Sequence, residues 1–188
     1  MSTIKKSVAP AEAHVALLRG INVGGNNKLP MKDLVLLFEA AGCGEVRSYI
    51  QSGNVVFRAP AKLVARVPAL LGASIEQRFG FRPPMVLRSA AALANVAAAN
   101  PYLAAGEDPD RLHVAFLSAT PAPARVAALD PDRSPPDRFT VQGDTIYLSL
   151  PNGVGKSRVT NAWLDSRLDC VSTLRNWRTV VELLAMCR

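Results

Sequence analysis

The sequence predicts an α+β fold in which two related β-α-β-β-α-β halves follow one another. Two observations lead to this prediction. Short apolar runs alternate with segments of helical periodicity over residues 14–100, which is the element order of a ferredoxin-like unit with an antiparallel sheet. Two of its strand motifs then return in the same order beyond residue 101, which indicates a duplicated half. We expect a disordered tail at residues 1–13, a first half at 14–100 and a second half at 101–188, packed intimately together.

The composition indicates a globular chain. Its 188 residues are 49% hydrophobic and 20% charged, which is enough to bury a sizeable core and excludes a wholly disordered protein. No apolar run is long enough to span a bilayer, and the N-terminus lacks the apolar core of a signal peptide. We therefore expect a cytoplasmic protein without a membrane partner. A formal net charge of +7 favours anionic partners such as nucleotides or nucleic acid.

The first half opens with a strand, a loop and a helix. Residues 15–18 form a continuous apolar run, as expected of a strand covered on both faces. The loop that follows is rich in glycine and asparagine, which tolerate positive φ most readily. Pro30 suits the first turn of a helix, and Gly42 is placed to end it. Between them the apolar residues recur at helical spacing: Leu34, Leu37, Phe38 and Ala41.

The remaining elements of the first half follow the same logic. We expect strands within residues 45–49, 55–57 and 85–88, with a turn at 51–54 between the first two. A helix over residues 63–79 contains Pro68, which must lie in its first turns or force a kink. An alanine-rich helix begins at Ser89, which is its expected cap, and ends near Asn100.

The second half repeats the strands but not the first loop. His113–Leu117 echoes His14–Leu18, and Gly143–Tyr147 echoes Gly53–Phe57. Residues 118–123 replace the glycine-rich loop, so a ligand site there would not be equivalent, and residues 130–137 are expected to be a surface loop. A last helix is expected over residues 174–186, with one apolar face formed by Leu174, Trp177, Val181 and Leu184.

One candidate binding site is the glycine-rich loop at the carboxyl end of the first strand. Such a loop gathers backbone N–H groups beside a helix N-terminus, where an anion can bind. The alternative is that the loop only shapes a tight connection, with Arg19 in a structural ion pair. Its glycine spacing does not match the dinucleotide-binding fingerprint. The candidates in the loop and the following turn are Arg19, Asn22, Gly24, Gly25, Asn26, Lys28, Gln51, Ser52 and Asn54.

A second candidate site is expected near the C-terminus. Residues 151–157 end in Gly-Lys-Ser, but Leu150 stands where a phosphate-binding P-loop needs glycine. We expect the polar residues that follow to gather at a helix start, where an anion would be stabilised. Helix capping on a solvated face is the alternative. The candidates are Asn152, Lys156, Ser157, Arg158, Asn161, Arg175 and Asn176.

The histidines and cysteines do not indicate catalysis. His14 and His113 each sit at a strand start, where a structural or surface role is expected. Cys43, Cys170 and Cys187 form no C-x-x-C pair and are expected to be free thiols. The sequence contains no recognisable nucleophile-base pair, metal-ligand cluster or paired carboxylates, so we expect neither a metal nor a cofactor.

Four motifs resemble a known family: ALLRGINVGGNNKLPM, YIQSGNVVF, LPNGVGKS and TLRNWRTV. Together, in this order, they look like a widespread bacterial family catalogued as domain of unknown function 1697. The resemblance covers nearly the whole chain after the tail. It implies an α+β fold of two interlocked ferredoxin-like plaits, and it implies no activity, substrate or catalytic residue.

Three functions are therefore open. The favoured hypothesis is a protein that binds a phosphate-bearing small molecule or nucleic acid between the RGINVGGNNK and PNGVGKSR loops. Scattered aromatic residues on the strands argue against an RNA-recognition sheet. The second hypothesis is an enzyme that acts on a phosphate ester, with Tyr49 and the 51–54 turn near the site. The third is a non-catalytic interaction module or a homodimer that pairs exposed sheet edges.

Overall fold

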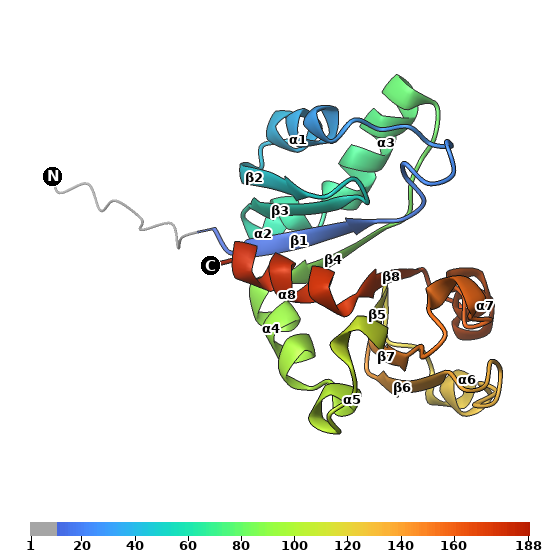
Figure 1. Ribbon diagram of the computed structural model, residues 1–188. Helices are drawn as coiled ribbons and strands as arrows, with labels where there is room; N and C mark the ends of the chain where they lie inside the picture. The colour runs from blue at the N-terminus through green and yellow to red at the C-terminus, as the bar shows by residue number, and fades with distance from the viewer. Residues whose placement is uncertain (1–10) are drawn as a thin grey trace, which may run out of the picture.

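The structure, a computed structural model, describes residues 11–188 and contains two four-stranded antiparallel sheets (Figure 1). The strand orders are β2-β3-β1-β4 and β6-β7-β5-β8, which confirms the predicted α+β class with ferredoxin-like halves. Residues 1–10 of the predicted tail lie outside the described residues, and Ala13 already belongs to the first strand.

The first half contains the strands and helices that the sequence predicts, in the predicted order. Its elements are β1 (Ala13–Leu18), α1 (Met31–Ala40), β2 (Gly44–Tyr49), β3 (Asn54–Arg58), α2 (Ala61–Val64), α3 (Val67–Phe79) and β4 (Met85–Ser89). The helix predicted over 63–79 is divided into α2 and α3, because Pro68 lies in the first turn of α3 and cannot continue a preceding helix. Ser89 caps the next helix as expected, since its hydroxyl accepts a hydrogen bond from the Ala92 N–H.

The second half has a matching set of strands. Its elements are β5 (Leu112–Leu117), α6 (Pro123–Ala127), β6 (Arg138–Gln142), β7 (Thr145–Ser149), α7 (Asn161–Leu168) and β8 (Ser172–Asn176). The helices α4 (Ala90–Ala98), α5 (Pro101–Ala104) and α8 (Trp177–Met186) and the short 3-10 turns η1 (Pro109–Arg111) and η2 (Val154–Lys156) complete the chain.

β1 lies at the centre of the first sheet and is buried along its whole length. Ala16 and Leu18 point to the face that α1 and α3 cover. Val15 and Leu17 point the other way, into a core shared with residues of β5, β7, α4 and α8 (Figure 1). Burial on both faces explains why this strand is apolar without alternation.

The prediction for the C-terminal helix is wrong at its start. Leu174, Arg175 and Asn176 belong to β8, which pairs with β5, and α8 begins only at Trp177. The Asn176 carboxamide accepts the Thr179 N–H and caps the helix. The buried face of α8 is formed by Trp177, Thr179, Val180 and Leu183, whereas Val181 is 46% exposed. The local pattern of apolar residues did not indicate β8, because the strand conformation of these five residues depends on pairing with β5.

Within each sheet, the central strand pairs with the last strand in an equivalent register. Val15 on β1 stands opposite Arg88 on β4, and Val114 on β5 stands opposite Arg175 on β8. β4 is followed by α4 and β8 by α8, and these two helices contact each other. This correspondence is consistent with the predicted duplication. Over residues 11–188, no helix is both long and apolar enough to cross a bilayer.

Candidate functional site

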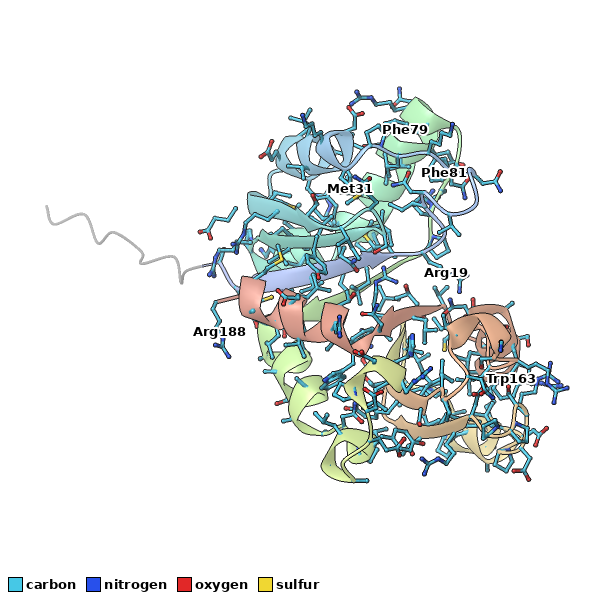
Figure 2. All side chains as sticks on the ribbon, in the orientation of Figure 1. Arg19, Met31, Phe79, Phe81, Trp163 and Arg188 are labelled. Carbon is cyan, nitrogen blue, oxygen red and sulfur yellow. The ribbon has the colours of Figure 1, made fainter. Side chains whose placement is uncertain are left out.

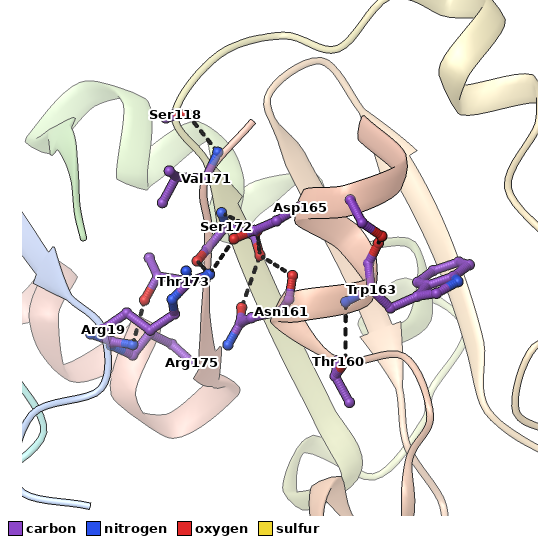
Figure 3. Close-up of polar contacts among 11 residues, drawn as sticks. Arg19, Ser118, Thr160, Asn161, Trp163, Asp165, Val171, Ser172, Thr173 and Arg175 are labelled. Carbon is purple, nitrogen blue, oxygen red and sulfur yellow. Dashed lines mark hydrogen bonds and ion pairs between the residues drawn. The ribbon is translucent and has the colours of Figure 1, made fainter. Parts of the chain in front are cut away.

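Polar residues from both halves meet where β1 ends. We call this group the polar junction. Its members come from the end of β1, the β2–β3 turn, the start of β3, α7 and β8: Arg19, Ser52, Asn54, Asn161, Asp165, Ser172, Thr173 and Arg175. Figure 2 shows Arg19 between the two halves, and Figure 3 shows most of these contacts. The polar junction is thus built from segments that are distant in the sequence.

Arg19 links the end of β1 to the second half. Its Nη1 donates to Asp165 Oδ2 at 2.7 Å and to the Ser172 carbonyl at 2.8 Å. The side chains of Arg19 and Asp165 are 26% and 24% exposed. Arg19 therefore forms the structural ion pair that the sequence analysis gave as its alternative role. This ion pair uses Nη1 of its guanidinium group.

Asp165 is held in place from the other side. Its Oδ1 accepts the Ser172 N–H at 2.7 Å and lies 2.6 Å from the Ser172 hydroxyl. The same hydroxyl lies 3.0 Å from Asn161 Oδ1. Ser172 itself is fully buried. Because both carboxylate oxygens of Asp165 have partners, this side chain is a fixed anion that compensates Arg19.

Arg175 is a buried member of the polar junction, and within residues 11–188 it has no carboxylate partner. Its Nε donates to Asn54 Oδ1 at 2.5 Å, and its Nη1 donates to Thr173 Oγ1 and to the Leu174 carbonyl, each at 2.8 Å. Its Nη2 donates to the carbonyls of Leu18 at 2.6 Å and Ser52 at 3.3 Å. Burial lowers the pKa of Arg175 to about 10. The guanidinium therefore stays charged at neutral pH.

The asparagines at the two ends of the β1–α1 loop shape the loop. Asn22 pairs with Leu29 through both its carboxamide atoms, each at 2.9 Å, and donates to the Gln51 carbonyl at 3.1 Å. Asn27 donates to the Gly20 carbonyl at 2.9 Å. Both asparagines adopt positive φ, near +54° and +48°, which asparagine tolerates better than most residues. The remaining predicted site residues of the loop are exposed, at its tip or, for Lys28, near its end: Gly24, Gly25, Asn26 and Lys28.

The second candidate site, around residues 152–161, is arranged differently from the expectation. α7 begins at Asn161 with Thr160 as its cap, so Lys156, Ser157 and Arg158 precede the helix rather than start it. The Ser157 hydroxyl accepts the Val159 N–H, and the Arg158 N–H donates to the Ser134 hydroxyl. The chain first makes the η2 turn and then continues in an extended conformation through Ser157, so the helix starts later than expected.

The two predicted loops lie near opposite ends of the second sheet, because the first contacts it through Arg19 at Ser172 and the second follows β7. Ser149, at the end of β7, is paired with Leu112 at the start of β5. Ser172, whose carbonyl accepts the hydrogen bond from Arg19, is paired with Leu117 at the end of β5. Five residues of strand separate these ends, about 16 Å at a rise of ~3.3 Å per residue. Within residues 11–188, no hydrogen bond or ion pair joins residues 19–28 to residues 152–158. Among the candidates of the second site, only Asn161 and Arg175 belong to the polar junction. Asn176 instead caps the N-terminus of α8.

Sequence reasoning missed Asp165, Ser172 and Thr173. Arg19 and Asp165 are 146 residues apart, and neither stands in a motif that points to the other.

The strand-start position of the histidines agrees with the expectation: His14 Nδ1 lies 2.9 Å from the Glu12 carbonyl, and His113 Nδ1 lies 3.4 Å from the Arg111 carbonyl. The cysteines are free thiols. No cluster of three potential metal ligands occurs among the described residues.

These features define a class: an α+β protein of two ferredoxin-like halves joined by a charged polar junction. The chain belongs to the family described as Protein of unknown function (DUF1697), whose sequence model matches residues 12–147. The fold is also similar to that of a conserved bacterial protein from Streptococcus pneumoniae, with a TM-score of 0.70 and 23% identity over 94% of this chain and 99% of that one. No curated protein sequence matches the chain significantly.

Proposed function

We propose that this protein binds a phosphate-bearing anion at the outer edge of the polar junction, beside Arg19 and the β1–α1 loop. The observation that carries the proposal is the excess of positive charge there, on the buried Arg175 and the partly buried Arg19. Of the described residues that form the junction, Asp165 alone carries a carboxylate, against the guanidinium groups of Arg19 and Arg175. An anion at the surface would meet this uncompensated charge in a medium of low dielectric constant, where attraction is stronger than in water.

Arg19 has donors available for such a ligand. Its Nη1 is used by Asp165 and Ser172, but within residues 11–188 its Nε and Nη2 make no hydrogen bond. A partly exposed guanidinium edge can bind two phosphate oxygens at once. The ion pair with Asp165 holds the side chain in one orientation, which reduces the conformational entropy lost on binding.

The loop that follows Arg19 adds weaker attraction. Lys28 is exposed near its end, and α1 begins after Pro30, which provides no side-chain cap for the first N–H groups of the helix. Free N–H groups at a helix start favour an anion. The segment containing Lys156 is not part of this proposal, which therefore replaces the predicted site between two loops.

The experiment is isothermal titration calorimetry at low salt with inorganic phosphate, nucleotides, sugar phosphates and short oligonucleotides. We expect binding to at least one of these classes, a loss of roughly tenfold or more in affinity for Arg19→Gln, and unchanged affinity for Lys156→Gln as the matched charge control. Nucleic acid is distinguished from a small ligand by a steep salt dependence of the binding constant. No binding by any class, or equal losses in both variants, would contradict the proposal.

A further inference from the structure

α1 has a second, outward face that residues 11–188 leave without a partner. Met31, Leu34 and Phe38 pack into the core, whereas Lys32, Leu36 and Glu39 are exposed and Val35 is partly exposed. Leu36 is 55% exposed, among the largest values for an apolar side chain in residues 11–188. In Figure 1, α1 lies on the side of the first half that faces away from the second half. Its outward face is therefore accessible.

The exposed residues form one continuous stripe. Lys32, Val35, Leu36 and Glu39 are spaced at i, i+3, i+4 and i+7, which places them on the same side of a helix. Between this stripe and β2 lies an open groove of about 460 Å³, lined by Met31, Lys32, Val35, Leu36, Glu39 and Ser48. An apolar side chain from a partner would fit against Val35 and Leu36 in this groove.

The charges of the stripe are self-complementary. Lys32 and Glu39 lie at equal distances on either side of the Val35–Leu36 pair, and within the described residues neither takes part in an ion pair or a side-chain hydrogen bond. By contrast, the neighbouring Asp33 is paired with Arg78 at 2.7 Å. Two copies of the stripe placed antiparallel about a two-fold axis bring each Lys32 opposite the Glu39 of the other copy.

We propose that the Lys32–Glu39 stripe of α1 is a self-association surface, whose partner is a second copy of this chain. The apolar centre provides Leu36-to-Leu36 contact, and the two reciprocal ion pairs set the antiparallel orientation. The sheet edge beside it is a poorer surface for pairing, because β2 has a register shift between Gly44 and Arg47 and a positive φ at Glu45. Such bulges hinder the addition of another strand.

The association is expected to be weak and reversible. α1 has ten residues, so the contact buries less than the roughly 800 Å² per partner of a standard protein interface. The test is therefore sedimentation velocity of the full chain over a wide range of concentration, up to the millimolar range. We expect the weight-average sedimentation coefficient to rise with concentration, as in a monomer–dimer equilibrium.

Charge exchange tests the orientation of the two copies. Lys32→Glu and Glu39→Lys alone each place like charges opposite one another, so each single variant should remain monomeric. The double variant Lys32→Glu/Glu39→Lys restores both pairs and should regain the dimer. An equimolar mixture of the two single variants should also associate, because their charges are then opposite. Leu36→Lys should abolish association, and Val181→Lys, at an exposed site on α8, should leave it unchanged.

Three results would overturn the proposal. The natural sequence remaining monomeric up to the millimolar range would mean that the stripe serves a different partner or none. A dimer that persists in Leu36→Lys would place the interface elsewhere. A double charge-exchange variant that stays monomeric, while circular dichroism shows an intact fold, would exclude the antiparallel pairing.

Discussion

Arg88 and Arg175 hold equivalent positions in the two halves, and each reaches across to hydrogen-bond the opposite half. Arg175 on β8 donates to the Leu18 carbonyl, and Arg88 on β4 donates to the Leu117 carbonyl at 2.8 Å. The match is not complete. Arg88 also forms an ion pair with Asp144 at 3.0 Å, whereas Arg175 meets the neutral Asn54.

This reciprocal pair explains how the halves are joined. Burial lowers the pKa of both arginines, and the Asp144 carboxylate partly offsets that effect for Arg88. Each guanidinium satisfies carbonyls at the end of the other half's central strand, which would otherwise be left without partners. Together with the shared core of α4 and α8, they make the two sheets one structural unit.

Loss of Arg175 should destabilise the whole chain. Arg175→Met leaves the Leu18 carbonyl and the Asn54 carboxamide without their charged donor, and we expect a cost of about 3 kcal/mol in the free energy of unfolding. The matched control is Arg178→Met on α8, whose side chain is 76% exposed and should cost no more than about 0.5 kcal/mol. Urea denaturation measures both. Two separate unfolding transitions in the natural sequence would contradict the single unit.

The equivalent glycines of the two halves should differ in their tolerance of alanine. Gly53 has a φ of +75°, and an added Cβ would lie 2.8 Å from Leu18 Cβ and 3.1 Å from the Leu18 carbonyl oxygen. Gly143 has a φ of +59°, and among residues 11–188 no atom lies within 4 Å of its added Cβ. We expect Gly143→Ala to cost about 1 kcal/mol through backbone strain alone. Gly53→Ala should cost at least about 2 kcal/mol more. Equal losses in thermal unfolding would show that the close approach at Gly53 relaxes freely.

His113 should make stability fall in mild acid. Burial lowers its pKa below the ordinary value of 6.5. The unfolded chain then binds a proton at a higher pH than the folded chain, so the free energy of unfolding decreases as the pH falls from 6.5 through the folded-state pKa. Urea denaturation at a series of pH values should show this slope, and His113→Gln should reduce it. An unchanged slope in the variant would assign the acid sensitivity to other groups.

Removal of the Asp165 charge should separate the two roles of Arg19. Asp165→Asn keeps an oxygen for Ser172 but breaks the ion pair with Arg19, and we expect it to cost about 1 kcal/mol of stability. The same change leaves the positive charge of Arg19 uncompensated, and we expect this gain in attraction to outweigh the lost orientation of the side chain. Affinity for a phosphate-bearing anion at low salt should therefore rise roughly threefold to tenfold. A purely structural Arg19 would predict reduced stability with no gain in affinity, which calorimetry would reveal.

Most of the fold could be predicted from the sequence because its signals are local. The apolar run of β1, the cap at Ser89 and the break at Pro68 depend on neighbours within a few residues. The echo of His14–Leu18 at His113–Leu117 indicated a second half, and both stretches are central strands. β8 was missed because its identity depends on pairing with β5.

Only some residues of the candidate site could be predicted from the sequence. The strand-end position of Arg19 and the polar character of the β2–β3 turn were sufficient to select Arg19, Ser52 and Asn54. Asp165 and Ser172, the partners of Arg19, lie more than a hundred residues further along the chain, where no spacing rule applies. The same holds for Thr173, which accepts a hydrogen bond from Arg175.

The sequence by itself determined the strands of the first half, the turns and the helix caps, because these depend on backbone preferences and on the period of apolar residues. Only the tertiary structure decided that Arg19 meets Asp165, that Arg175 is buried against Leu18, and that residues 152–158 lie apart from the β1–α1 loop. The physical reason is that these contacts follow from strand register and sheet packing, which place distant residues together through the hydrogen bonds of the whole sheet.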